Sequence, residues 1–227
     1  VFVKMGEFKA LSFEELFQGT KALPWGDWIP VDGKFTVVGK SVKSTLHSVP
    51  DCQAIVKKAI VEKLKEKYEV DWFDETGAEY TVQVALLKDV ATLTIDTSGS
   101  GLHKRGYRAN ALDAPLKETL AAAMVELSYW NKDRILLDPF CGSGTIPIEA
   151  ALIARNIAPG LNRHFASEKW ERVPEKLWKE ERRRCYEAID YNCMPKIYGS
   201  DIDPAAIELA KANAELAGVD DCITFEV

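Results

Sequence analysis

The hydrophobic and polar positions of the chain follow two different patterns, one before and one after residue 97. Apolar residues recur at helical spacing over 49–68, where Pro50 suits the first turn, and this predicts a helix. Apolar or alternating runs at 35–38, 79–87 and 90–96 predict strands, the last two joined by a tight turn. We therefore expect residues 1–96 to form a small α+β domain with antiparallel pairing.

Beyond residue 97 strands alternate with helices. The stretch 97–112 begins with a flexible Thr-Ser-Gly-Ser-Gly sequence, which predicts a linker. After it, helices are expected at 115–129, 145–156, 174–192 and 204–217, and strands at 134–138, 196–199 and 222–227. This alternation is typical of a parallel, doubly wound sheet, so residues 113–227 are predicted to form an α/β domain.

The composition suits a protein of one or two domains that does not enter a membrane. Of the 227 residues 47% are hydrophobic, and no apolar run approaches the roughly 20 residues needed to cross a bilayer. The five cysteines form no Cys-x-x-Cys pair, and no cluster of histidines accompanies them. We therefore expect reduced thiols, no metal site and a cytoplasmic location.

The net charge of −6 argues against a protein that coats nucleic acid over its whole surface. Positive charge is nevertheless concentrated in two segments. The sequence from Lys40 to Lys67 contains seven lysines and three acids, and residues 97–112 contain three cations and no acid. On the 57–67 helix such lysines are also what a solvated face would show.

A glycine-rich sequence, Asp-Pro-Phe-Cys-Gly-Ser-Gly-Thr, occupies 138–145, between a predicted strand and a predicted helix. Such a turn lets backbone approach a ligand closely, and the helix N-terminus behind it suits a negative charge. A P-loop would need a lysine directly after Gly144, where Thr145 stands. A dinucleotide fingerprint would need a third glycine at Pro147 and an acid about 20 residues further on, and both are missing.

The turn instead resembles the first motif of class I methyltransferases that act on exocyclic amines and use S-adenosylmethionine (SAM). Residues 197–203 resemble the second motif, in which an acid at the end of a strand binds the ribose hydroxyls. We assign that role to Asp201, because a carboxylate offers two strong acceptors to two neighbouring hydroxyls. Asp203 either joins it or caps the next helix. Cys141 is not expected to be a nucleophile. The predicted cofactor-binding residues are Asp138, Pro139, Phe140, Cys141, Gly142, Ser143, Gly144, Thr145, Asp201, Ile202 and Asp203.

A closer resemblance spans nearly the whole chain. The sequences at 39–44, 48–58, 102–108 and 114–123 are similar to those of bacterial THUMP-domain methyltransferases, which include the large-subunit ribosomal RNA guanine-N2 methyltransferases and are often labelled N6-adenine-specific DNA methylases. The resemblance implies a THUMP-type RNA-binding domain at 1–96 and a Rossmann-like class I methyltransferase domain at 113–227. It implies SAM as cofactor, and guanine N2 in 23S ribosomal RNA as the target.

The catalytic motif of that family, Asn-Pro-Pro-aromatic, does not occur in the 227 residues. We therefore expect the chain to be a fragment of a longer protein, with the first part of the THUMP region missing from the fragment, and we name no catalytic residue. Adenine N6 in DNA stays open as an alternative target, as does an RNA-binding protein without chemistry.

Candidate RNA contacts lie in the two basic segments. A phosphate-binding track is predicted from five cations: Lys40, Lys43, Lys104, Arg105 and Arg108. In the alternative reading the two arginines bridge the two domains through acids. Substituting Arg105 and Arg108 by alanine is expected to leave SAM affinity unchanged. A further set, Arg163, His164 and Lys169, either lines the substrate entrance or belongs to a packed cap.

Overall fold

The computed structural model of the protein describes residues 1–108 and 115–227. The chain divides into two compact units. Unit 1 comprises Val1–Gly99 and Phe165–Glu175, and unit 2 comprises Ser100–His164 and Lys176–Val227. The predicted end of the linker at 112 and the predicted start of the second domain at 113 lie outside the described residues.

Unit 1 is built on a four-stranded sheet in the order β1-β4-β3-β2. Its strands are β1 (Phe2–Lys9), β2 (Lys34–Val42), β3 (Glu79–Leu87) and β4 (Val90–Asp96). The pair β3–β4 is antiparallel, as predicted, and β1, which was not predicted, pairs antiparallel with β4, but β2 and β3 run parallel. The prediction of purely antiparallel pairing was wrong because β2 and β3 are joined by a helical crossover, the connection that parallel neighbours require.

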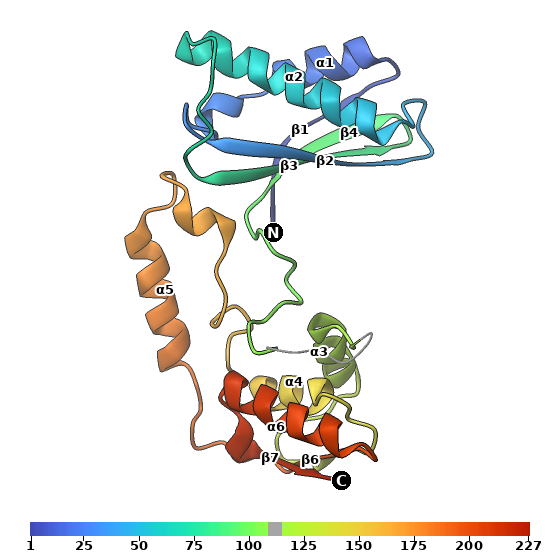
Figure 1. Ribbon diagram of the computed structural model, residues 1–227, viewed down its shortest axis with the longest axis vertical. Helices are drawn as coiled ribbons and strands as arrows, with labels where there is room; N and C mark the ends of the chain where they lie inside the picture. Colours follow the sequence, from blue (N-terminus) through green and yellow to red (C-terminus); the bar gives the residue numbers. More distant parts are fainter. Residues whose placement is uncertain (109–114) are drawn as a thin grey trace. The chain divides into compact units, whose positions relative to one another are not determined.

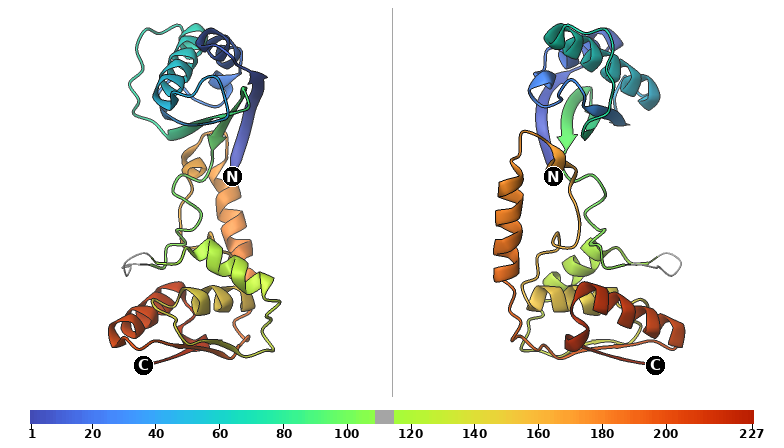
Figure 2. Two further views of the ribbon diagram at one scale, coloured as in Figure 1. Left: turned by 90° about the vertical axis from the view of Figure 1, so that its right-hand side faces the viewer. Right: turned by 60° about the vertical axis from the view of Figure 1, so that its left-hand side comes forward.

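Helices α1 (Phe13–Lys21) and α2 (Val49–Tyr68) cover one face of this sheet (Figures 1 and 2). A capping box fixes the start of α1, because the Ser12 side chain accepts from the Glu15 N–H while the Glu15 side chain accepts from the Ser12 N–H. The core between helices and sheet contains Leu16, Ile60 and Leu93, each almost fully buried.

The segment Phe165–Glu175, which lies in the sequence of the predicted second domain, packs into unit 1. Trp170 is 2% exposed, stacks on Tyr80 with ring centroids 4.7 Å apart, and donates its indole N–H to the Glu79 carbonyl. The Ser167 hydroxyl donates to the Thr97 carbonyl. This segment therefore forms part of the hydrophobic core of unit 1.

Unit 2 contains a parallel sheet in the order β5-β6-β7, as the alternating pattern predicted. Its strands are β5 (Leu136–Asp138), β6 (Ile197–Ser200) and β7 (Ile223–Glu226), and its helices are α3 (Glu118–Leu127), α4 (Thr145–Ala154), α5 (Glu175–Glu187) and α6 (Pro204–Ala217). Figures 1 and 2 show α4 and α6 side by side on one face of this sheet. On the other face Leu137 and Tyr198 are exposed.

Residues 100–108, which were predicted to belong to a linker, are not a free linker in the structure. Tyr107 is 2% exposed and belongs to the core of unit 2. Arg163 is also buried and donates to the carbonyls of Ser100, Gly101 and Lys104. Within residues 1–108 and 115–227, no helix is both long and apolar enough to cross a membrane.

Candidate cofactor site in unit 2

The glycine-rich turn connects β5, which ends at Asp138, to α4, which begins at Thr145. Gly142 and Gly144 both have left-handed backbones, with φ of +53° and +80°. A Cβ on Gly144 would lie 3.0 Å from the Ala210 Cβ of α6 and 3.1 Å from the Phe225 ring of β7, whereas a Cβ on Gly142 would meet nothing within 4 Å. Gly144 is thus required by packing, and Gly142 faces open space.

Asp201 joins the two predicted motifs. Its Oδ2 accepts from the Gly142 N–H at 3.0 Å, and its Oδ1 accepts from the Asp203 N–H at 3.0 Å. The Cys141 N–H donates to the Ser200 carbonyl at 2.9 Å, which fixes the turn against the end of β6. Each carboxylate oxygen of Asp201 keeps a further lone pair with which it can accept a ligand hydroxyl.

Asp203 is the N-cap residue of the next helix, α6, in this structure. Its side chain accepts from the Ala205 N–H at 2.9 Å and caps the N-terminus of α6. Phe140 and Ile202, one in each motif, are 87% and 94% exposed. Two large apolar side chains therefore lie beside the turn with almost no protein around them.

Burial controls the ionisable groups of the turn. It raises the pKa of Asp138 above its ordinary value, and the nearby charge of Asp201 adds to this effect. Burial likewise raises the pKa of the Cys141 thiol to about 12. The thiol therefore stays protonated at neutral pH, in agreement with the expectation that Cys141 is no nucleophile.

Two residues outside the predicted motifs, Asn213 and Arg108, donate hydrogen bonds to the end of the turn and the start of α4. The Asn213 side chain of α6, 1% exposed, donates to the carbonyl of Ser143 at 3.1 Å. Arg108 donates to Thr145 Oγ1 at 2.7 Å and to the Leu116 carbonyl at 3.1 Å. Asn213 could have been noticed as a polar residue among the alanines of the predicted helix 204–217, but the Arg108 contact has no local signal.

The basic segment 104–108 is largely neutralised within unit 2. Arg105 Nη2 lies 3.3 Å from a Glu149 oxygen, and the Tyr107 hydroxyl donates to the other Glu149 oxygen at 2.9 Å. Burial raises the pKa of Glu149 despite the nearby Arg105, and burial together with Glu149 raises the pKa of Tyr107. Arg108 Nε lies 3.6 Å from Glu118.

These contacts correct two expectations. Arg105 and Arg108 do pair with acids, but Glu149 and Glu118 belong to the same unit as the arginines, so the pairs do not bridge the two units. The segment is also not independent of the cofactor turn, because Arg108 contacts Thr145 directly.

The remaining basic residues divide between the units. Lys40 and Lys43 are exposed in unit 1, and Lys104 is exposed in unit 2. Arg163 is buried among carbonyl groups, as the packed-cap alternative would have it, and Lys169 belongs to unit 1. Among the described residues, no group of three His, Cys, Asp or Glu side chains could hold a metal ion.

The sequence was compared with protein families. Residues 105–227 match the RMKL-like methyltransferase domain, and residues 10–96 match the THUMP domain. The first match covers more than half of the chain. The chain belongs to the RMKL-like methyltransferase family.

Within this family the chain is similar to two curated proteins. It is 58% identical over 226 residues, 99% of its length, to the Bacillus subtilis protein named "Putative RNA methyltransferase YpsC", of which it spans 59%. It is 38% identical over 232 residues to "Ribosomal RNA large subunit methyltransferase K/L" of Psychromonas ingrahamii, and that match covers 100% of the chain and 31% of the relative. The chain therefore corresponds to only part of each relative.

Two solved structures share the fold. One is described as a predicted N6-adenine-specific DNA methylase from Listeria monocytogenes, with 57% identity and a TM-score of 0.95 over 99% of this chain and 60% of the other. The second is described as "SMU.472, a putative methyltransferase complexed with SAH", where SAH is the demethylated product of SAM. It has 45% identity and a TM-score of 0.93 over 99% of this chain and 60% of the other. An RMKL-like methyltransferase domain preceded by a THUMP domain is thus the architecture of the chain.

Proposed function

We propose that the protein of which this chain is a part uses SAM to methylate an exocyclic amine of a base in RNA, with guanine N2 of 23S ribosomal RNA as the target. The observation that carries the proposal is the Asp201 carboxylate, which is bonded to the backbone of the glycine-rich turn. Membership of the RMKL-like family and the SAH complex of a relative support SAM as the cofactor.

The residues of the site fit this cofactor. The space above Gly142 leaves room for the ligand backbone, and Asp201 has acceptor capacity for two ribose hydroxyls. Phe140 and Ile202 offer exposed apolar surfaces to a flat adenine ring. The N-terminus of α4, which begins at Thr145, presents free N–H groups toward a carboxylate.

Bound SAM would supply an electrophilic methyl group on a sulfonium. Transfer of this methyl group to the target nitrogen would leave SAH, and the amine would release one proton to water. Catalysis of such an in-line displacement depends mainly on alignment. In this proposal Asp201 and the turn hold the nucleoside part, while Asn213 and Arg108 keep the turn rigid from behind.

RNA is favoured over DNA because the chain carries a THUMP match and because two curated relatives are named as RNA methyltransferases. Adenine N6 in DNA is the second candidate, since one closely similar structure carries that description. The phosphate track predicted at Lys40, Lys43, Lys104, Arg105 and Arg108 remains a proposal for the RNA contacts.

A methyl-transfer assay with the full-length protein tests the proposal. The protein is given SAM with a labelled methyl group, together with either unmodified 23S ribosomal RNA or duplex DNA, and the products are digested to nucleosides for mass spectrometry. We expect N2-methylguanosine from the RNA and no label in DNA. Label only in N6-methyladenine of the DNA, or no label in either polymer, would contradict the proposal.

A further inference from the structure

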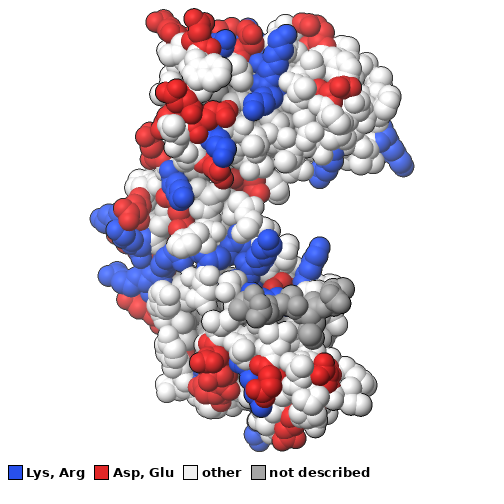
Figure 3. All heavy atoms as spheres, viewed as in Figure 1, with Lys and Arg blue, Asp and Glu red and all other residues white. Residues whose placement is uncertain are grey.

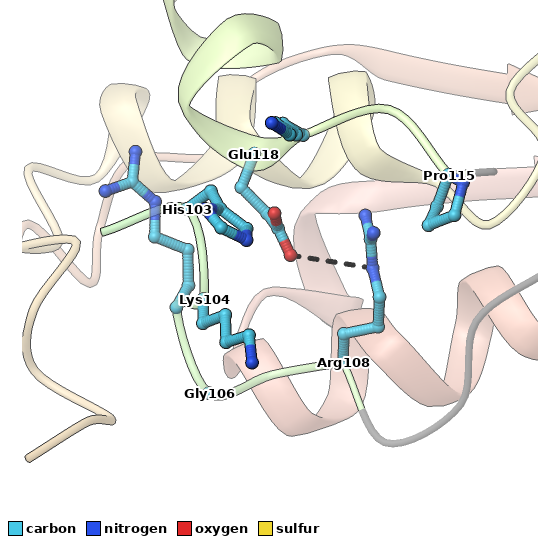
Figure 4. Close-up of a pocket in the computed structure, with 8 residues that line it drawn as sticks. His103, Lys104, Gly106, Arg108, Pro115 and Glu118 are labelled. Atoms are coloured by element: carbon cyan, nitrogen blue, oxygen red, sulfur yellow. Dashed lines mark ion pairs between the residues drawn. The ribbon is translucent and has the colours of Figure 1, made fainter. Parts of the chain in front are cut away.

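A second feature of unit 2 is a cavity of about 560 Å³ next to the basic segment. It is lined by residues from two places: the segment 103–108, and residues 115–118, which lead into α3 (Figure 4). The lining residues are His103, Lys104, Arg105, Gly106, Arg108, Pro115, Lys117 and Glu118. All of them lie in unit 2.

The charge of this lining differs from that of the chain. Four of the eight lining residues are lysine or arginine and one is an acid, in a chain whose net charge is −6. On the face shown in Figure 3, basic side chains gather at one end of unit 2, whereas acidic side chains lie over α6. A concave site with an excess of fixed positive charge attracts anions.

The four cations do not have the same role. The Arg105 and Arg108 side chains are only 12% and 14% exposed and are held by Glu149 and Glu118. The dashed line in Figure 4 marks the second of these pairs. Lys104 and Lys117 are exposed, and neither has an ion pair with the residues that the structure describes. The arginines therefore shape the wall, whereas no carboxylate of residues 1–108 or 115–227 pairs with the two lysines and competes with a ligand.

The cavity is also linked to the cofactor turn through one side chain. Arg108 lines the cavity and donates to Thr145, the first residue of α4 after the turn. An anion held in the cavity would therefore lie close to the proposed methyl donor. In a nucleic-acid enzyme the anion that must be fixed next to the target base is the phosphate of its own strand.

We propose that this cavity binds a backbone phosphate of the RNA strand beside the target nucleotide, through Lys104 and Lys117, with His103 on the same wall. The inference rests on the proposed function, since it assigns part of the RNA substrate to a place. In unit 2 it keeps Lys104 from the predicted track and makes Lys117, rather than the acid-paired Arg105 and Arg108, the second principal phosphate contact. The volume is large enough for a nucleotide, and not merely for a free anion.

The test uses the full-length protein and unmodified 23S ribosomal RNA. In one variant Lys104→Ala and Lys117→Ala are combined. A matched control combines Lys132→Ala and Lys211→Ala, which remove the same charge from exposed lysines of unit 2 that pair with Asp190 and Glu208. Substituting the arginines would be less informative, because Arg108 also supports the cofactor turn.

RNA affinity is measured over a range of KCl concentrations. Each phosphate contact that is lost on single-stranded RNA reduces the magnitude of the slope of log K against log salt by about 0.7. The Lys104/Lys117 variant loses its one proposed phosphate, so its slope should be shallower by about 0.7. Its KM for RNA should rise while kcat and SAM affinity stay those of the unmodified protein. The control should keep both the slope and the KM.

Two failures can be told apart. If the unmodified protein methylates RNA but the Lys104/Lys117 variant matches the control in slope and KM, the cavity proposal is wrong and the proposed function stands. If the unmodified protein transfers no methyl group to RNA, the proposed function fails first. A Lys117→Glu variant, which reverses the charge, should weaken RNA binding further, and unchanged binding there would also overturn the cavity proposal.

Discussion

The proposed contact between Asp201 and the ribose can be measured apart from the structural role of Asp201. Removing the carboxylate by Asp201→Ala deletes the ribose acceptors, but it also leaves the N–H groups of Gly142 and Asp203 without their acceptor. Lower SAM affinity alone would therefore not identify the contact. A ligand that lacks one ribose hydroxyl removes the same contact by changing the ligand instead of the protein. The two proteins and the two ligands together form a double-mutant cycle.

The size of the expected effect follows from the chemistry. A hydrogen bond to a charged acceptor contributes about 1.5–3 kcal/mol, which corresponds to about 10- to 150-fold in affinity. The unmodified protein should bind SAH more tightly than 2′-deoxy-SAH, or more tightly than 3′-deoxy-SAH, by a factor in this range. Asp201→Ala should weaken SAH binding and bind all three ligands with nearly equal affinity.

Isothermal titration calorimetry on the full-length protein supplies the four dissociation constants of each cycle. Asp203→Ala is the matched control, because it removes a neighbouring carboxylate that caps α6 and contacts Asp201 only through its backbone. This control should still distinguish SAH from the deoxy ligands. If Asp201→Ala weakens binding but discriminates against the deoxy ligands as strongly as the unmodified protein does, Asp201 only shapes the turn and the ribose assignment is refuted.

Two further predictions concern the stability of each unit. Trp170→Ala should lower the free energy of unfolding of unit 1 by about 3–5 kcal/mol, because a buried aromatic side chain is lost, whereas Trp72→Ala at a 79% exposed site should change it by less than about 0.5 kcal/mol. Labelling of the buried Cys52 thiol in denaturant measures the free energy of unfolding of both variants. Equal effects of the two substitutions would show that Trp170 is not part of this core. Arg155 lowers the pKa of Asp221 through a two-pronged pair at 2.8 and 2.7 Å, so this pair stabilises unit 2 above the ordinary pKa of the carboxyl and less as the pH falls through the lowered value. Asp221→Asn should cost about 1 kcal/mol at neutral pH, a small value because the Asp221 side chain is 55% exposed, and should weaken the acid sensitivity of amide exchange in β7; an unchanged acid dependence would contradict this assignment.

Elements with a strong local pattern could be predicted from the sequence. The bounds of α2, β3, β4 and α6 agree with the predicted ranges, because each has a clear apolar period and a turn or proline at its start. Strand β1 was missed because a register shift between Lys4 and Gly6 interrupts its alternation. Helix α1 was missed although Ser12 and Glu15, the two ends of its capping box, stand at the spacing typical of a helix start.

The candidate cofactor site could also be predicted from local sequence patterns. The glycine-rich turn is a local feature, and Asp201 was assigned because residues 197–203 resemble the second motif of class I methyltransferases. The parallel pairing of β5 with β6 then brings the end of β6 next to the turn. The placement of Trp170 could not be predicted in this way. It depends on contacts between residues that lie 90 positions apart, such as the bond to the carbonyl of Glu79, and a short loop segment shows no period that reveals its partner.

The basic segment shows most clearly where charge in a sequence misleads. Residues 104–108 contain three cations and no acid, and this pattern alone indicates a surface for phosphate. In the folded chain Glu149 and Glu118 come from α4 and α3 and neutralise two of the three cations, so the arginines hold a wall in place. Of the cations that line the cavity, Lys104 and Lys117 have no ion pair with a described residue, and Lys117 stands next to Glu118 in the sequence and therefore adds no local excess. Among the four cations that line the cavity, Lys104 and Lys117 are the two without a carboxylate partner in the part of the chain that the structure describes, and this is why the proposal assigns the anion to them.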